Sequence, residues 1–280
     1  MFTFNIVILH YKYTEFAQQR PISFQKDKKN WVIGDIHGCY ETFSILVEEQ
    51  IQLTKSDTLY LLGDYIDRGQ NSKGVIDYIL ALRQMGYDIV SLKGNHEDVM
   101  LRCYQAAKSA SSGIGFYDLH DSWLHFGGKD TLASFEITHA KYLEPEYVQF
   151  LEELQNYQVL ENFVLTHAGL NFALEDPFSD ELAMMWIKNM PFDAAKIQYK
   201  RLVHGHVPTA LETIRENIES ENPVLCLDNG CVYQGYKGLG SLVALELGSM
   251  ELKVQPNVEL NNKKARKKWL NTSLTTEATY

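Results

Sequence analysis

The feature that most constrains the fold of this chain is a β-like run, a glycine turn and a helical pattern, repeated three times at a spacing of roughly 30 residues. The apolar runs and the glycines that follow them are residues 31–33 with Gly34, 58–62 with Gly63, and 88–92 with Gly94. Consecutive parallel strands need a helical crossover between them. The repeat therefore predicts a largely parallel sheet.

Further β-like runs lie in the second half of the chain, at residues 163–166, 201–203, 224–227, 241–246 and 251–254. The later runs lie close together with glycine-rich turns between them, which is typical of antiparallel hairpins. A parallel sheet followed by an antiparallel one predicts two packed sheets flanked by helices. Residues 109–135 are rich in Ser, Gly and aromatic residues and predict an irregular cap with short helices.

The length of 280 residues is ordinary for a single α/β domain. We expect an N-terminal extension at residues 1–29, one folded domain at 30–256 and a polar, basic tail at 257–280.

The charge and composition exclude several classes of protein. Lys and Arg number 26 against 36 Asp and Glu, which gives a net charge of −10 and disfavours a nucleic-acid binder. The longest wholly apolar run, residues 182–187, is far shorter than the roughly 20 residues of a membrane helix, and no secretory signal is visible. The four cysteines have no C-x-x-C spacing, which favours reduced thiols and a cytoplasmic location. Nothing in the sequence indicates an oligomeric state.

The glycine turns carry polar residues of one kind. Residues 34–38 read Gly-Asp-Ile-His-Gly, residues 63–69 read Gly-Asp-Tyr-Ile-Asp-Arg-Gly, and residues 94–97 read Gly-Asn-His-Glu. Ligands collect at the carboxyl ends of strands in open α/β sheets, so we expect these side chains to lie together. Thr-His-Ala-Gly at 166–169 and His-Gly-His at 204–206 follow later β-like runs and offer further imidazoles.

Carboxylates, an amide oxygen and imidazoles without a thiolate suit borderline-hard divalent metals. The candidate ligands exceed what one ion needs, whereas two ions that share a carboxylate would use them all. Two metals roughly 3.5–4 Å apart form a clamp for in-line displacement at phosphorus. Taken singly, Asp35, Asp64 and Asn95 also suit helix N-caps or turns, and His204 competes with His206 as a ligand.

The motifs in this order resemble the phosphoprotein phosphatase family of calcineurin-like metallophosphoesterases, and in particular the small bacterial and phage serine/threonine phosphatases. The likeness runs from about residue 31 to 247. It includes residues 123–132, which begin Trp-Leu and contain Gly127 and Gly128. The resemblance implies an α+β fold, a four-layer αββα sandwich of two mixed sheets flanked by helices.

The resemblance also implies roles for individual residues. The metal ligands would be Asp35 and His37 for the first ion, Asp64 as the bridge, and Asn95, His167 and His206 for the second ion. The catalytic pair would be His96, the general acid, and Asp67, which orients it, while a hydroxide held between the metals attacks phosphorus. Phosphate would be bound by Arg68 and Asn95. Mn²⁺ is the implied metal, with Fe, Zn or Ni as alternatives.

One position departs from the family pattern. Relatives carry a second phosphate-binding Arg shortly after a Trp, and here Lys188 stands two residues after Trp186. Lysine is a point charge and cannot form the bidentate fork of arginine. We therefore expect Lys188 to bind phosphate more weakly or in another orientation, unless it is a solvated lysine.

These features predict a dinuclear metal-dependent phosphomonoester hydrolase, favoured as a serine/threonine protein phosphatase. Its substrate would be a phosphorylated protein or a small phosphoester. One alternative is a symmetrical diadenosine tetraphosphatase or another nucleotide phosphohydrolase, although the symmetrical enzymes usually lack an Asp equivalent to Asp67 and have Asp in place of Glu97. Another alternative is a non-catalytic domain that keeps the fold to bind a partner.

Overall fold

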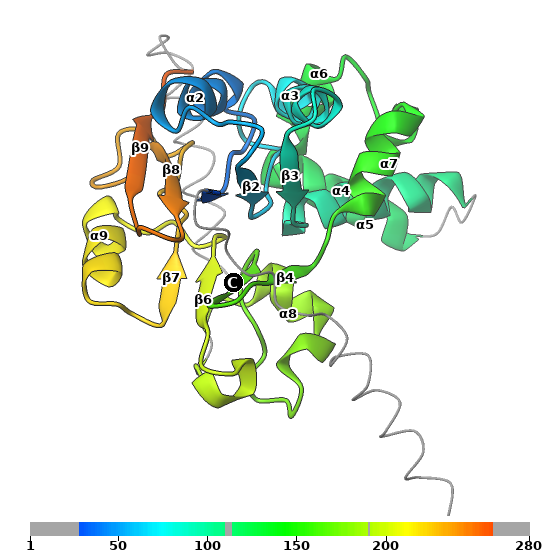
Figure 1. Cartoon of the computed structure of the whole chain (residues 1–280). Helices are drawn as coiled ribbons and strands as arrows, with labels where there is room; N and C mark the ends of the chain where they lie inside the picture. Colours follow the sequence, from blue (N-terminus) through cyan, green and yellow to red (C-terminus); the bar gives the residue numbers. More distant parts are fainter. Residues whose placement is uncertain (1–27, 110–113, 190, 260–280) are drawn as a thin grey trace, which may run out of the picture.

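The structure is a computed structural model and describes residues 28–109, 114–189 and 191–259. Most of the predicted N-terminal extension and of the predicted tail lies outside the described residues. The two sheets and their helices are shown in Figure 1.

The first sheet has five strands in the order β3–β2–β1–β8–β9. Their bounds are β1 (Asn30–Ile33), β2 (Thr58–Leu61), β3 (Asp88–Ser91), β8 (Ser241–Glu246) and β9 (Leu252–Pro256). Strands β1, β2 and β3 are parallel, which confirms the parallel sheet expected from the glycine-turn repeat. Strand β8 runs antiparallel to β1, and β9 forms the predicted hairpin with β8.

The second sheet has four strands in the order β4–β5–β6–β7. Their bounds are β4 (Tyr157–Val159), β5 (Phe163–Thr166), β6 (Arg201–His204) and β7 (Val224–Cys226). The expectation of antiparallel hairpins is wrong here, because β5, β6 and β7 are parallel and β4 is antiparallel to β5. Helical segments follow β5 and β6, so each connection is long enough to return the chain to the same edge of the sheet.

Alternating side chains bury both faces of the sheets. In the first sheet, Trp31 and Ile33 of β1 face an outer helical core, while Val32 between them faces a core shared with the second sheet. In the second sheet, Leu165 faces the shared core and Val164 faces a third, outer core. Successive side chains of a strand point to opposite faces, so near-continuous apolar strands suit this arrangement.

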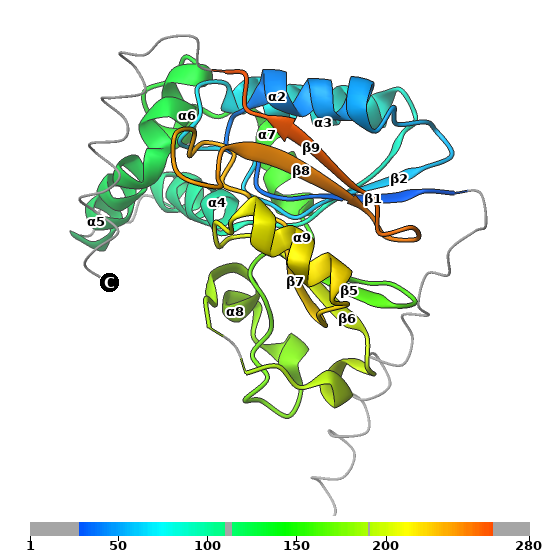
Figure 2. The ribbon, with the colours of Figure 1, turned by 90° about the vertical axis from the view of Figure 1, so that its left-hand side faces the viewer.

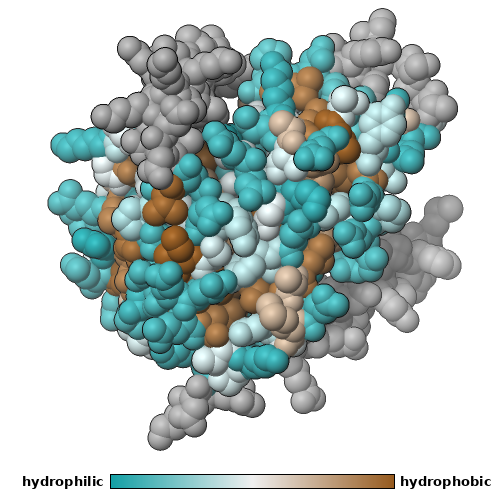
Figure 3. All heavy atoms as spheres, turned by 90° about the horizontal axis from the view of Figure 1, so that it is seen from above, coloured by the Kyte–Doolittle hydropathy of each residue, from teal (hydrophilic) through white to brown (hydrophobic). Residues whose placement is uncertain are grey.

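Most helices cover the outer faces of the two sheets, whereas the helix at Leu211–Glu219 packs against the core that the sheets share. Their bounds are α2 (Tyr40–Ile45), η1 (Leu46–Gln50), α3 (Ser72–Gln84), α4 (Asn95–Lys108), α5 (Ile114–Trp123), η2 (Leu124–Gly128), α6 (Lys129–Ser134), η3 (Ala140–Tyr142), α7 (Pro145–Glu153), η4 (Pro177–Ser179), α8 (Glu181–Trp186), η5 (Ala194–Ile197) and α9 (Leu211–Glu219). Helices α2 and α3 lie over the first sheet and α8 lies beyond the second (Figure 2). The four-layer αββα sandwich is confirmed. Figure 3 shows the side of the molecule on which α2 and α3 lie, and this surface is mostly hydrophilic with scattered hydrophobic residues.

The predicted cap at residues 109–135 is more regular than expected in its described part. Helix α5, the π-helical turn η2 and helix α6 follow one another directly, with a kink at Gly127. Gly127 has φ of 114°, and a Cβ there would come within 2.5 Å of the backbone nitrogen of Arg68. Glycine therefore lets this helical segment approach the turn after β2 closely.

Candidate metal centre

The turns after β1, β2, β5 and β6 and the start of α4 meet at one place, as the sequence predicts. They bring together Asp35 and His37, Asp64 with Asp67 and Arg68, Asn95 and His96, His167, and His206. Both sheets contribute, because β5 and β6 end beside the turns of the first sheet. Asp35, His37, Asp64, His96 and His167 are all buried.

Several of these residues have a left-handed backbone. His37, Asp64 and Asp67 have φ of 47°, 52° and 69°, and Arg68 and His206 have 67° and 69°. Residues other than glycine rarely adopt this conformation, which costs about 1–3 kcal/mol when it is imposed. Such residues persist where surrounding contacts hold them, and here the backbone N–H of His37 donates to the carbonyl of Asp64 at 2.8 Å.

Glu97 holds the turn that carries Asp64. Its buried carboxylate accepts the backbone N–H groups of Asp64 at 2.9 Å, Tyr65 at 2.8 Å and Gly94 at 3.0 Å. Burial, with Asp64 nearby, raises the pKa of Glu97 to about 8. Sequence reasoning used Glu97 only to compare family branches. The signal for its role was its position three residues after Gly94, where a helix-capping glutamate is common.

Two glycines let backbone lie against the carboxylates. A Cβ at Gly94 would come within 2.1 Å of Asp64 Oδ1, and a Cβ at Gly205 would come within 2.1 Å of Asp35 Oδ1. The backbone N–H of His206 then reaches both oxygens of Asp35 at 3.1 Å. Any larger residue at either glycine would displace a carboxylate of the site.

Two groups of side chains could each hold a metal ion, and Asp64 belongs to both. One group is His37, Asp64 and His96, and the other is Asp64, His167 and His206, with ligand atoms within 4.8 Å of one another in each. Asp35 belongs to neither group, although it lies beside them. The shared carboxylate matches the bridging position expected for Asp64.

The hydrogen bonds of His167 support a cation at the second group. Nδ1 of His167 contacts the carbonyl of Leu62 at 3.0 Å, so Nδ1 carries a proton. Burial lowers the pKa of His167, which leaves the ring neutral and Nε2 with a lone pair. That lone pair faces Asn95 Oδ1 at 3.0 Å and Asp64 Oδ1 at 3.4 Å. Three acceptor atoms converge without a proton among them, and a metal ion would satisfy all three.

His206 completes the same group. Its Nδ1 lies 3.0 Å from Asn95 Oδ1, and its buried Nε2 has no hydrogen-bond partner among the described residues. Burial, followed by the neighbouring imidazole of His167, lowers the pKa of His206 to about 3. His206 is therefore a neutral imidazole, the form that binds metals.

The first group shows the same pattern at His37. Its Nδ1 contacts the carbonyl of Ile66 at 2.9 Å, which leaves Nε2 free to act as a ligand. Burial, followed by the charge of Arg68, lowers the pKa of His37 well below its usual value. Nε2 lies 3.5 Å from Asp64 Oδ2 and receives a guanidinium N–H of Arg68 at 3.0 Å. A cationic group thus already lies against this lone pair.

The site gathers several buried carboxyl groups, whose burial and mutual repulsion oppose ionisation. Burial, with Asp228 and Asp64 nearby, raises the pKa of Asp35 well above its usual value, and burial raises that of Asp228 to about 7. Asp228 lies outside the motifs that predicted the site. Carboxylates gathered in this way need cations, so the donor set fits divalent metal ions.

His96, a member of the first group, forms a buried pair with Asp67. Nδ1 of His96 lies 2.6 Å from Asp67 Oδ2. Nε2 of His96 lies 3.8 Å from Asp64 Oδ2. The Asp67 carboxylate orients the ring so that Nε2 faces the metal groups.

The proposed phosphate-binding residues lie at different depths. Arg68 also contacts the hydroxyl of Tyr233 at 3.3 Å. Lys188 is exposed, just beyond α8, and its charge acts on His206. Trp186, the last residue of α8, is 39% exposed, with its ring centroid 6.4 Å from that of His206.

The remaining candidates have structural positions. His204 is buried and contacts the carbonyl of Gly205 through Nδ1, and it lies in neither metal group. Asn229 donates to the carbonyls of Thr209 and Gly238. Cys39 is a buried free thiol.

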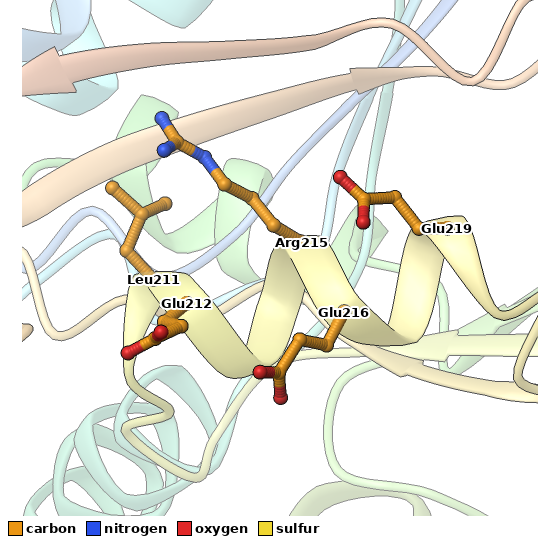
Figure 4. Close-up of a pocket in the computed structure, with 5 residues that line it drawn as sticks. All are labelled: Leu211, Glu212, Arg215, Glu216 and Glu219. Atoms are coloured by element: carbon orange, nitrogen blue, oxygen red, sulfur yellow. The ribbon is translucent and has the colours of Figure 1, made fainter.

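A separate depression lies along α9, away from the metal groups. Leu211, Glu212, Arg215, Glu216 and Glu219 line it (Figure 4). It contains none of the predicted site residues. Among the described residues, no helix is both long and apolar enough to cross a membrane.

Comparison with known proteins gives a consistent picture. The model of the calcineurin-like phosphoesterases matches residues 29–231. Serine/threonine-protein phosphatase 2 of Escherichia coli is 38% identical over 96 residues, which cover 33% of this chain and 42% of that protein. The asymmetrical bis(5'-nucleosyl)-tetraphosphatase PrpE of Anoxybacillus flavithermus is 26% identical over 253 residues, 79% of this chain and 91% of that protein.

The fold is also found among solved structures. A serine/threonine protein phosphatase from Saccharomyces cerevisiae superposes with a TM-score of 0.54 at 15% identity, over 91% of this chain and 90% of that one. At this identity the likeness concerns the fold alone.

Proposed function

Because this chain belongs to the calcineurin-like phosphoesterase family, and is therefore a metal-dependent phosphatase, we propose that it hydrolyses phosphate monoesters of phosphoserine or phosphothreonine in proteins. The observation that carries the proposal is the pair of histidine–carboxylate groups that share buried Asp64. The His96–Asp67 pair beside them supplies the acid that ester cleavage needs. We also propose a cytoplasmic location, because the spacing of the four cysteines favours reduced thiols.

The metal-binding residues keep the roles that the motifs predict. Asp35, His37 and Asp64 would hold one ion, and Asp64 with Asn95, His167 and His206 would hold the other. When bound, the two ions supply an activated water and neutralise phosphate charge. The nitrogen and oxygen ligands suit Mn²⁺.

The protein's own residues handle the proton and the phosphate. His96 gives the proton on Nε2 to the leaving alkoxide, and Asp67 stabilises its orientation through Nδ1. Arg68 binds phosphate oxygens with its planar fork, with Asn95 beside it. Lys188 contributes a longer-range positive charge at the exposed edge of the site.

A dinucleotide polyphosphate is the second candidate substrate. One relative, of which this chain covers 91% of the length, is named an asymmetrical bis(5'-nucleosyl)-tetraphosphatase. Trp186 offers an exposed ring beside His206, and aromatic rings stack well on nucleobases. The presence of Asp67 and Glu97 favours the protein phosphatase over the symmetrical enzymes. A non-catalytic binding domain is disfavoured, because the full set of ligand and acid residues is brought together.

The test is Mn²⁺-dependent turnover of p-nitrophenyl phosphate, a phosphothreonine peptide and diadenosine tetraphosphate, measured side by side. We expect peptide hydrolysis that is abolished by chelation and reduced by His96→Asn about 10²–10⁴-fold. Preference for the dinucleotide would replace the substrate proposal. Activity that survives chelation would overturn the metal mechanism.

A further inference from the structure

We propose that Trp123 and Thr131, on the helical segment from α5 to α6, are positioning residues for proton donation by His96. This inference rests on the proposed function, because it takes His96 as the general acid. The motifs of the metal turns do not contain either residue, and neither reaches the metal groups. Both act on His96 through the carboxylate of Asp67.

The contacts join three distant parts of the chain. Asp67 Oδ2 accepts the indole N–H of Trp123 at 2.9 Å beside Nδ1 of His96 at 2.6 Å. Asp67 Oδ1 accepts the hydroxyl of Thr131 at 2.6 Å. Asp67, Trp123 and Thr131 are each 0% exposed. The carboxylate is therefore oriented by two donors from the helical segment and one from α4.

The hydroxyl protons of this cluster have one consistent arrangement. An ionised carboxylate only accepts, so the single proton of Thr131 points to Asp67 Oδ1. The oxygen of Thr131 then accepts the backbone N–H of Asp67 at 2.8 Å, and the hydroxyl of Ser72, 3.0 Å away, donates to Thr131. Thr131 therefore forms hydrogen bonds to both the side chain and the backbone of Asp67, whose φ is 69°.

Glycines hold the helical segment against the turn. A Cβ at Gly128 would come within 2.6 Å of the Trp123 ring, so this glycine lets the ring lie flat on the backbone. The carbonyl of Gly127 accepts the backbone N–H of Arg68 at 3.4 Å. The segment therefore packs directly on the turn that carries Asp67 and Arg68.

The chemical consequence concerns the leaving group. As the bond between phosphorus and the ester oxygen breaks, the proton on His96 Nε2 moves to that oxygen. An alkoxide or phenolate of high basicity needs this proton, whereas p-nitrophenolate leaves readily without it. Loss of Trp123 N–H or Thr131 hydroxyl frees Asp67 to rotate and moves His96 out of line. Hydrolysis of basic leaving groups should then fall much more than hydrolysis of p-nitrophenyl phosphate.

The experiment compares kcat on phenyl phosphate and on p-nitrophenyl phosphate for the full chain with Mn²⁺. Trp123→Phe keeps the ring without its N–H, and Thr131→Val keeps the shape without the hydroxyl. We expect each to lower kcat on phenyl phosphate about 10–100-fold and kcat on p-nitrophenyl phosphate less than about threefold, with KM unchanged. Thr131→Ser keeps the hydroxyl, so the ratio of kcat on phenyl phosphate to kcat on p-nitrophenyl phosphate should equal that of the unaltered chain.

Trp31→Phe is the matched control, because Trp31 is a buried indole of the first sheet with no hydrogen-bond partner for Nε1 among the described residues. It should leave the ratio of the two rates unchanged. Equal losses on both substrates in Trp123→Phe and Thr131→Val, or no loss at all, would overturn the inference.

A second readout does not depend on turnover. The short bond between His96 Nδ1 and Asp67 should give a downfield imidazole proton resonance that His96→Asn removes. We expect Trp123→Phe and Thr131→Val to shift or broaden it and Trp31→Phe to leave it. If the unaltered chain turns over neither substrate, the proposed function fails. The resonance then still decides whether these residues position His96, and an unmoved resonance contradicts it.

Discussion

Glu97 and Asp64 are joined through the backbone, because the carboxylate of Glu97 at the start of α4 accepts the N–H of Asp64 at 2.9 Å. The same carboxylate accepts the N–H groups of Tyr65 and Gly94. The carboxylate proposed to bridge the two metals is thus held by a residue that is not itself a proposed ligand.

Glu97→Gln should weaken this support, since an amide has one acceptor oxygen in place of two. A buried N–H group that loses its acceptor costs about 1–3 kcal/mol, so we expect a loss of about 2 kcal/mol in the free energy of unfolding. Mn²⁺ affinity should fall with it. Thermal unfolding and calorimetric titration measure the two effects, with exposed Glu216→Gln on α9 as the control. Unchanged Mn²⁺ affinity in Glu97→Gln would contradict the role of this carboxylate.

Gly205→Ala should disable the site through Asp35. The added methyl would lie 2.1 Å from Asp35 Oδ1, so the carboxylate must move. We expect Mn²⁺ binding and turnover to fall at least tenfold while the fold is kept. The control is Gly86→Ala, which has φ of 86° and nothing within 4 Å of the added methyl. It should lower Tm through backbone strain of about 1 kcal/mol and leave metal binding intact. Full activity in Gly205→Ala would show that Asp35 is not needed.

Lys188 tests how the departure from the family pattern affects substrate binding. Lys188→Arg adds a planar fork, so KM for the phosphopeptide should fall about 3–10-fold with little change in kcat. Lys188→Ala should raise KM by a similar factor. Because Lys188 is exposed, neither change should alter Tm. Lys55→Ala, before β2 at the opposite end of the sheet, is the control. Identical KM values across the series would remove Lys188 from the phosphate site.

The sequence predicted the site better than the sheets around it. The turn motifs singled out Asp35, His37, Asp64, Asn95, His167 and His206 as candidate ligands, and the structure brings these side chains together. Strand direction in the second sheet was missed, since the connection after β5 consists of short helical segments and the helix α9 after β6 was not predicted. The contact of Trp123 with Asp67, 56 residues apart, was also missed. A hydrogen bond between distant segments leaves no local pattern in the sequence. The role of Glu97 was missed for a different reason, because it binds backbone N–H groups, which give no signal in residue type.

Glu246 gives the stability a pH dependence outside the site. Burial alone would raise its pKa, but the N–H of Asn30 and the N–H and hydroxyl of Ser249 outweigh burial and lower it. A lowered pKa stabilises the fold above the ordinary value of 4.5, and this stabilisation is lost as pH falls through the folded value. Glu246→Gln should cost about 1–2 kcal/mol at pH 7 and much less at pH 3.

Denaturant unfolding from pH 7 to pH 3 measures this difference, with exposed Glu212→Gln as the control. If the difference in unfolding free energy between Glu246→Gln and the unaltered chain stays constant from pH 7 to pH 3, the charge of Glu246 does not stabilise the pairing of β1 with β8.

Sharing of Asp64 by two metal ions can be tested by counting the Mn²⁺ ions bound per chain after equilibrium dialysis. The account predicts two ions on the unaltered chain, one on His206→Ala, which lacks a ligand of the second group only, and none on Asp64→Asn. Two ions retained by Asp64→Asn would contradict it.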